Sequence, residues 1–153
     1  MSSDLWSFAL AVYARCGVED ACLHLQSAGA NVCLMLCGLW LEQRGVSCEE
    51  ERLRELEQLT APWDREVVQP LRELRMQWKT RAETDAVLKG MREQVKGLEL
   101  EAERALLSRL EGVAQGWARN SADQAVWLEG LAGAAAHLNR DALQVLRVAA
   151  IGT

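Results

Sequence analysis

The feature that most constrains this chain is segment 31–41, Asn-Val-Cys-Leu-Met-Leu-Cys-Gly-Leu-Trp-Leu, which carries no charge. From Val32 onward its apolar side chains occupy every direction around a helical wheel, so a helix here has no face suited to water. Eleven helical residues span roughly 16 Å, about half of the bilayer core. The segment therefore predicts a helix at the centre of a protein core, wrapped by other helices, and not a membrane span.

The rest of the chain predicts the helices that surround it. Strand-like alternation is absent, β-branched residues are few, and the 153 residues include only two prolines. Glycines and capping residues divide the sequence into helices expected at about 4–15, 18–27, 31–44, 48–59, 60–78 with a kink or break at Pro70, 84–111, 121–138 and 141–150. The expected fold is all-α, a compact bundle of six to eight helices with one long amphipathic helix.

Two helix starts rest on specific caps. Ser47 and Glu50 have the spacing of a capping box for the helix at 48–59, and Thr84 is the expected cap of the long helix. The long helix carries an apolar stripe at close to helical spacing: Leu88, Met91, Val95, Leu98, Ala102, Leu106, Leu110 and Val113. Leu100 and Leu107 lie off this stripe, which predicts that they face outward.

Charge is distributed unevenly along the chain. Residues 46–112 hold 15 of the 22 acidic and 12 of the 17 basic residues, whereas the first 45 residues are mostly apolar. This pattern favours a single helical domain over 1–153, in which 1–60 form an apolar core and 61–153 form extended amphipathic helices that pack on it.

Charge and cysteine usage narrow the expected location and partners. The net charge of −5 disfavours broad nucleic-acid binding and polybasic membrane contact. The N-terminal Met-Ser-Ser-Asp lacks the basic region of a signal peptide, and an odd number of cysteines, five, is typical of reduced thiols. These features predict a cytoplasmic protein.

The sequence contains no convincing metal, cofactor or catalytic constellation. Cys33 and Cys37 share a helix face, but Cys22 and His24, two residues apart on a helix, point in different directions and cannot complete a common metal site. Asp20 and His24 have the spacing of an ordinary helix-surface hydrogen bond. We therefore expect no metal, no cofactor and no catalytic residue, and a non-enzymatic role is favoured.

Tryptophan usage is the strongest functional hint. Six of the eight aromatic residues are tryptophan, and Trp63, Trp78, Trp117 and Trp127 lie in charged or glycine-rich segments where complete burial is harder. Tryptophan and arginine are typical anchors of protein interfaces. The preferred hypothesis is an interaction or adaptor protein that binds another protein or itself, with these interface candidates: Trp63, Arg72, Arg75, Trp78, Leu100 and Leu107.

Two alternatives remain open. A small-molecule-binding or catalytic helical domain would use a pocket between the first three helices, near Tyr13, His24 and Asn31. Nucleic-acid binding by Arg72, Arg75 and neighbouring basic residues is disfavoured, because acidic residues on the same helix neutralise part of their positive charge.

The N-terminal half also resembles a known family. The motifs are LWxFALxxYA from Leu5, GVExACLxLQ from Gly17, NVxLxLxxLWL from Asn31 and VVQPLRELR from Val67, where x marks a position outside the match. Over residues 4–80 they are similar to a family of short, uncharacterised proteobacterial proteins. The resemblance implies a bacterial, non-secreted protein and brings no assigned activity.

Overall fold

The structure is a computed structural model that describes residues 4–119, 126–133 and 135–151. Within these ranges the chain is helical and contains no strand. The helices are α1 (Asp4–Tyr13), α2 (Val18–Ser27), α3 (Val32–Gln43), α4 (Glu50–Trp63), the π-helical turn η1 (Asp64–Val68), α5 (Gln69–Gln77), α6 (Lys79–Ala82), the long α7 (Ala86–Ala114), α8 (Trp127–Ala132), α9 (Ala135–Leu138) and α10 (Arg140–Ala150). The predicted all-α fold with one long helix is confirmed. More segments appear than expected because α6 and α9 are single turns of four residues.

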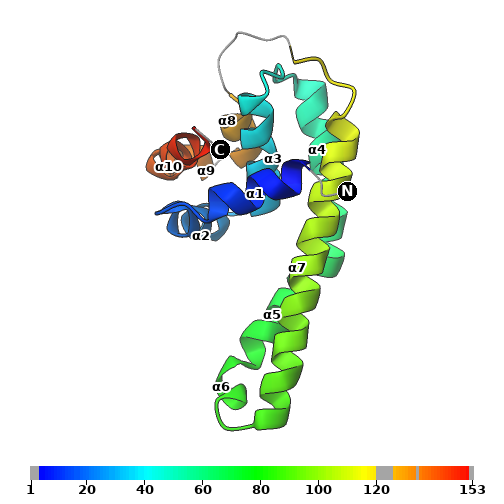
Figure 1. The fold of residues 1–153 in the computed structure, drawn as a ribbon, viewed down its shortest axis with the longest axis vertical. Coiled ribbons are helices and arrows are strands. Elements are labelled where there is room, and N and C mark those ends of the chain that lie inside the picture. The colour runs from blue at the N-terminus through cyan, green and yellow to red at the C-terminus, as the bar shows by residue number, and fades with distance from the viewer. Residues whose placement is uncertain (1–3, 120–125, 134, 152–153) are drawn as a thin grey trace.

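The helices form a head and a projecting arm (Figure 1). The head contains α1–α3 and α8–α10, together with the C-terminal part of α7. The arm, residues 69–100, consists of α5 and α6 packed against the N-terminal half of α7. At about 1.5 Å per residue, the 29 residues of α7 extend roughly 43 Å, which carries the arm well beyond the head.

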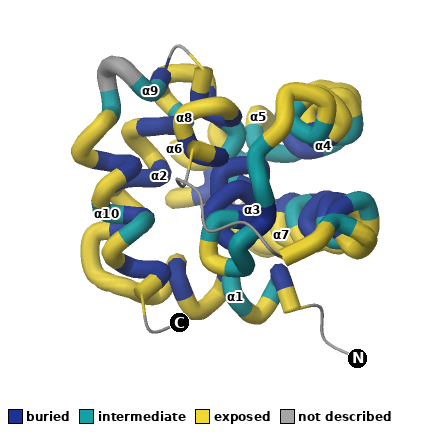
Figure 2. The backbone as a smooth tube through the Cα atoms, turned by 90° about the horizontal axis from the view of Figure 1, so that it is seen from above, coloured by how far each residue is buried: buried dark blue, intermediate teal, exposed yellow. Residues whose placement is uncertain are grey.

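The central helix is α3, as predicted from its uncharged sequence. All residues from Cys33 to Leu41 are buried, and α1, α7, α8 and α10 contact the helix. In the view along the arm, α3 is dark blue and lies in the middle of the head (Figure 2). Gly38 permits the close approach of α8, because a Cβ added there would lie 2.6 Å from Leu131 Cδ1.

The C-terminal helices complete the head. Trp127 is only 1 % exposed, its indole Nε1 donates to the Val46 carbonyl at 2.8 Å, and its ring stacks on Trp117. The expectation that this tryptophan would resist burial is therefore wrong. Arg147 of α10 pairs with the Glu42 carboxylate of α3 at 2.9 Å, which ties the last helix to the central one.

The predicted boundary at residues 60–62 is wrong. The helix α4 continues through Pro62 to Trp63, and the Thr60 hydroxyl donates to the Leu56 carbonyl at 2.8 Å inside it. The break expected at Pro70 takes the form of η1, which lies directly before α5. In this wider turn the Gln69 amide donates to the Asp64 carbonyl, five residues back. A π-helical turn accommodates the proline, which has no amide donor, without ending the helical run.

Both predicted caps are displaced. The capping box at Ser47 does not form: α4 begins at Glu50, and the Ser47 hydroxyl accepts from Arg52 Nη1 at 3.3 Å. The long helix is capped one residue later than expected, by Asp85, whose carboxylate accepts from the Leu88 amide at 3.1 Å. A short polar side chain at either of two adjacent positions can serve as a cap, so spacing alone selects the wrong one.

The predicted stripe of the long helix is partly wrong. Met91 and Leu98 are 47 % and 51 % exposed, whereas Glu99 is buried and faces α5. Leu107, which was expected to face outward, is 2 % exposed and belongs to the core. The stripe shifts because α7 packs against α5 and α6 in the arm but against α1, α3 and α4 nearer the head. None of the helices described reaches the length and apolarity required to cross a bilayer.

Candidate binding cleft

A cleft of about 810 Å³ lies between the head and the arm. One wall comes from α1, α2 and α3, and the other comes from α5, α6 and α7. Five large apolar side chains that are 40–62 % exposed meet there: Leu10, Tyr13, Leu23, Met76 and Leu100. These residues come from four helices, so the fold gathers exposed apolar surface that no single helix displays.

The head wall of the cleft is uncharged. Its residues are Trp6, Ala9, Leu10, Tyr13, Cys22, Leu23, Gln26, Ser27, Val32, Cys33 and Leu36. Leu10 and Leu23 lie off the buried stripes of their short helices, which turn Leu5, Ala9 and Val12 or Ala21, Cys22 and Leu25 inward. The off-stripe positions of Leu10 and Leu23 are a sequence signal for this wall of the cleft, and neither leucine was among the predicted site residues.

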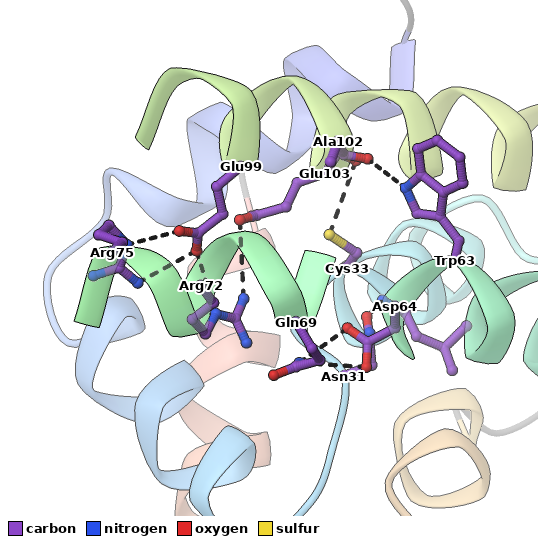
Figure 3. Close-up of polar contacts among 11 residues, drawn as sticks. Asn31, Cys33, Trp63, Asp64, Gln69, Arg72, Arg75, Glu99, Ala102 and Glu103 are labelled. Carbon is purple, nitrogen blue, oxygen red and sulfur yellow. Dashed lines mark hydrogen bonds and ion pairs between the residues drawn. The ribbon is translucent and has the colours of Figure 1, made fainter. Parts of the chain in front are cut away.

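The opposite wall contains an ionic network centred on Glu99 (Figure 3). Arg75 donates from Nε to Glu99 Oε1 at 2.7 Å, and Arg72 donates from Nε to Glu99 Oε2 at 3.2 Å. Burial alone would raise the pKa of Glu99, but the hydrogen bonds from Arg75 and Arg72 hold this pKa below its ordinary value. The network joins α5 to α7 at the base of the arm.

Glu103 lies one turn further along α7 and behaves differently. Its carboxylate is 3.9 Å from Arg72, a long ion pair. Burial, followed by the negative charge of Glu99, raises the pKa of Glu103 above its ordinary value. The two neighbouring carboxylates of the cleft therefore have pKa values displaced in opposite directions.

Two further cations, Lys79 of α6 and Arg92 of α7, line the cleft on the arm side. Arg92 donates from Nε to the Arg75 carbonyl at 2.8 Å, which fixes the guanidinium without neutralising it. Within the described part of the chain, neither cation has a carboxylate within ion-pair distance. Four cations and two carboxylates line this wall, an excess of two positive charges in a chain of net charge −5.

A smaller and more polar hollow of about 270 Å³ adjoins the cleft, and Arg72 and Glu103 line both. Asp64 of η1 accepts from Gln69 Nε2 at 3.1 Å at its edge (Figure 3). Asn31 also lines this hollow, where its side chain caps α3 by accepting from the Leu34 amide at 3.0 Å.

The three residues expected to share one pocket are not brought together. Tyr13 lines the cleft and Asn31 lines the polar hollow. His24 lies on the exposed side of α2, beside a separate hollow formed with α10. Of the three predicted pocket residues, Tyr13 alone lines the cleft, and the three do not form a common site.

Four of the six predicted interface residues lie together. Arg72, Arg75 and Leu100 line the cleft, and the buried Leu107 forms part of its floor. Trp63 lies elsewhere, where its indole Nε1 donates to the Ala102 carbonyl at 2.9 Å and Arg109 covers its ring. Trp78 is half-buried at the end of α5 and does not line the cleft.

Tryptophan and arginine do associate, but within the chain. Among the described residues, guanidinium groups lie over indole rings in four pairs: Arg44 over Trp40, Arg52 over Trp117, Arg104 over Trp6 and Arg109 over Trp63. Such contacts contribute about 0.5–1 kcal/mol each at exposed sites. These tryptophans thus contribute to packing between helices, and the half-exposed leucines are the more accessible apolar groups.

The cysteines do not form a site with other ligands. In the described ranges no three residues of histidine, cysteine, aspartate and glutamate gather closely enough to hold a metal ion. Burial raises the pKa of the Cys22 thiol to about 11 and that of Cys37 to about 12. Both thiols are therefore protonated and weakly nucleophilic near neutral pH.

Comparison with known proteins gives one match. No curated protein and no solved structure matches the chain. The model of the family described as "Protein of unknown function (DUF2390)" matches residues 4–110, which include both walls of the cleft. This chain belongs to the DUF2390 family.

Proposed function

We propose that this chain is a non-enzymatic interaction protein of the bacterial cytoplasm, and that its cleft binds a helical segment of another protein. The observation that carries the proposal is the convergence of Leu10, Tyr13, Leu23, Met76 and Leu100 on one cleft. A contiguous apolar surface of this kind is typical of an interaction site. Five unpaired cysteines are compatible with a reducing compartment.

The openness of the cleft favours a helix as its occupant. Leu10, Leu23 and Leu100 are 52–54 % exposed, so the cleft remains open to solvent along both walls. Small-molecule sites usually enclose most of the ligand surface, whereas an amphipathic helix places only its apolar face in a groove. Apolar side chains on both walls can contact that face together.

Two leucines on the same helix give a matched test. Leu100 lines the cleft and is 54 % exposed, while Leu98 is 51 % exposed and does not line it. We expect Leu100→Glu to abolish capture of a stoichiometric partner by the tagged full chain, because a charge then lies in the apolar groove. The matched Leu98→Glu variant should capture the partner normally.

The measurement is affinity capture from the native lysate with quantitative mass spectrometry, with circular dichroism and light scattering on each purified variant. Equal capture by the two variants, or loss with Leu98→Glu alone, would contradict the proposal. A stable dimer that Leu100→Glu dissociates would identify the helical partner as a second copy of the chain.

A second candidate function is binding of a small amphiphile in the same cleft. The volume of about 810 Å³ falls within the range of ligand pockets, roughly 300–1,000 Å³. Native mass spectrometry of the protein purified without detergent distinguishes the two. A bound small molecule that Leu100→Glu removes, in the absence of any captured protein, would favour this candidate.

A further inference from the structure

The charge of the cleft indicates what kind of helix it accepts. We propose that the bound segment is an amphipathic helix with acidic residues along the edge that faces α5, α6 and α7. This inference rests on the proposed function and specifies the chemical class of the partner.

The two walls of the cleft differ in charge. The head wall contributes no charged side chain, whereas the opposite wall contributes Arg72, Arg75, Lys79, Arg92, Glu99 and Glu103. An occupant must therefore place its apolar face toward α1, α2 and α3, and its polar edge toward the arm. Only one rotation of an amphipathic helix about its axis satisfies both walls.

The positive charges at the rim of the cleft are not all neutralised by carboxylates of the chain. Both oxygens of Glu99 accept hydrogen bonds from Arg72 and Arg75, which satisfies this carboxylate inside the wall. Lys79 is exposed, and in the described ranges neither it nor Arg92 has an ionic partner. A carboxylate on the occupant would find available cations there, whereas a lysine would meet repulsion.

The charged residues are also unevenly distributed along the length of the cleft. Glu103 and Leu107 lie on α7 near the head, whereas Arg92 and Lys79 lie further along the arm. The carboxylates are thus confined to the deep end, and the cations without acidic partners occupy the outer end. The acidic residues of the occupant are accordingly expected where the helix leaves the cleft toward the tip of the arm.

The test is a selection with a displayed library of helical peptides. Each peptide keeps leucines on one face, and every flanking position is varied among glutamate, glutamine and lysine. The targets are the full-length wild type, the Leu100→Glu variant, the double variant Lys79→Glu/Arg92→Glu and a matched control, Arg81→Glu/Lys89→Glu. The control changes the net charge by the same amount at two exposed arm cations that do not line the cleft.

Wild type and control should enrich glutamate along one edge, and the Lys79→Glu/Arg92→Glu variant should enrich lysine there. A selected acidic peptide should bind the double variant about tenfold more weakly than wild type, by fluorescence anisotropy, and bind the control within about twofold. Raising the salt concentration should reduce the difference between wild type and the double variant, because Lys79 is exposed and Arg92 is only half-buried, so dissolved ions screen both charges.

The outcomes separate this inference from the proposed function. Enrichment that Leu100→Glu removes but that shows no preference for glutamate would overturn the acidic-helix inference and leave the proposed function standing. Enrichment that survives Leu100→Glu, or a library that yields no binder on wild type, would overturn both. Loss of binding with the Arg81→Glu/Lys89→Glu control would overturn the inference, because binding would then depend on the net charge of the protein and not on the cations of the cleft.

Discussion

The interior of the head and the interior of the arm are stabilised by different interactions. In the head, nine consecutive residues of α3, Cys33–Leu41, are buried. In the arm, residues 69–100, only Ala82, Val95 and Glu99 are buried, and one of these three is a carboxylate. The head is thus a closed apolar core, whereas the three helical segments of the arm bury few residues and are linked by ion pairs around Glu99.

Because the arm buries few residues, it exposes several large apolar side chains. Met76, Val87, Met91, Leu98 and Leu100 are all at least 47 % exposed in the arm. Exposed single apolar residues are common, but a contiguous group is usually functional. Met76 and Leu100 are the members of this set that line the cleft, so they are the ones for which the fold provides an opposing wall.

The largest expected change in stability comes from a cavity made in the core of the head. Trp127→Ala should lower the free energy of unfolding by about 3–5 kcal/mol, because it creates a cavity and leaves the Val46 carbonyl without its indole donor. In the arm, Leu98→Ala should change it by less than about 0.5 kcal/mol, since Leu98 is half-exposed. Urea unfolding followed by circular dichroism measures both. Similar losses of unfolding free energy for the two variants would show that Leu98 is packed as tightly as Trp127, which contradicts the difference between a closed head and an exposed arm.

The next effect compares the two carboxylates that face Arg72. Glu99→Gln should destabilise the protein by about 1–3 kcal/mol at pH 7, because Arg75 and Arg72 lose a charged acceptor in a largely buried setting. Glu103→Gln should be neutral or slightly stabilising, because it removes a half-buried charge whose ion pair with Arg72 is long, at 3.9 Å. Urea unfolding of both variants at pH 7 provides the comparison, and a larger loss for Glu103→Gln would contradict this assignment of roles.

The signs of the two pKa shifts add a pH dependence. The pKa of Glu99 is lowered in the folded state, so its contribution is present above the unfolded pKa and is lost as the pH falls through the folded value. The pKa of Glu103 is raised, so its contribution is present below the unfolded pKa and is lost as the pH rises through the folded value. The gap between wild type and Glu99→Gln should therefore narrow below about pH 4. A gap that widened on acidification would show that the sign is wrong.

Sequence reasoning worked best where one residue decides the local structure. The bounds of α2, Val18–Ser27, were predicted because glycines with positive φ, Gly17 and Gly29, lie at its two ends. The buried position of α3 followed from the lack of any charged residue between Val32 and Leu41. In both cases the information is local, so no knowledge of neighbouring helices was required.

Prediction from the sequence was wrong where a neighbouring helix determines which side chains are buried. An apolar stripe places Leu98 inward and Glu99 outward, but the structure reverses them because Arg72 and Arg75 on α5 provide partners for the carboxylate. The cleft was not predictable for the same reason. Leu10 and Leu23 lie in the head, whereas Leu100 lies in the arm and far from both in sequence, and only the arrangement of the arm against the head brings all three to one cleft.

The smallest expected effect compares two glycines, one in each region. A Cβ added to Gly97, in the arm, meets no atom within 4 Å, whereas one added to Gly38, in the head, lies 2.6 Å from Leu131 Cδ1. Gly97→Ala should therefore raise the free energy of unfolding by about 0.5–1 kcal/mol through its helix propensity alone. Gly38→Ala should not raise it, because Leu131 must move within a close-packed core. Thermal and urea unfolding of the two variants measure the difference. If Gly97→Ala instead destabilised the protein or changed its mass in light scattering, the outer surface of α7 would be packed against another copy rather than open, and the contrast between the two regions would have to be redrawn.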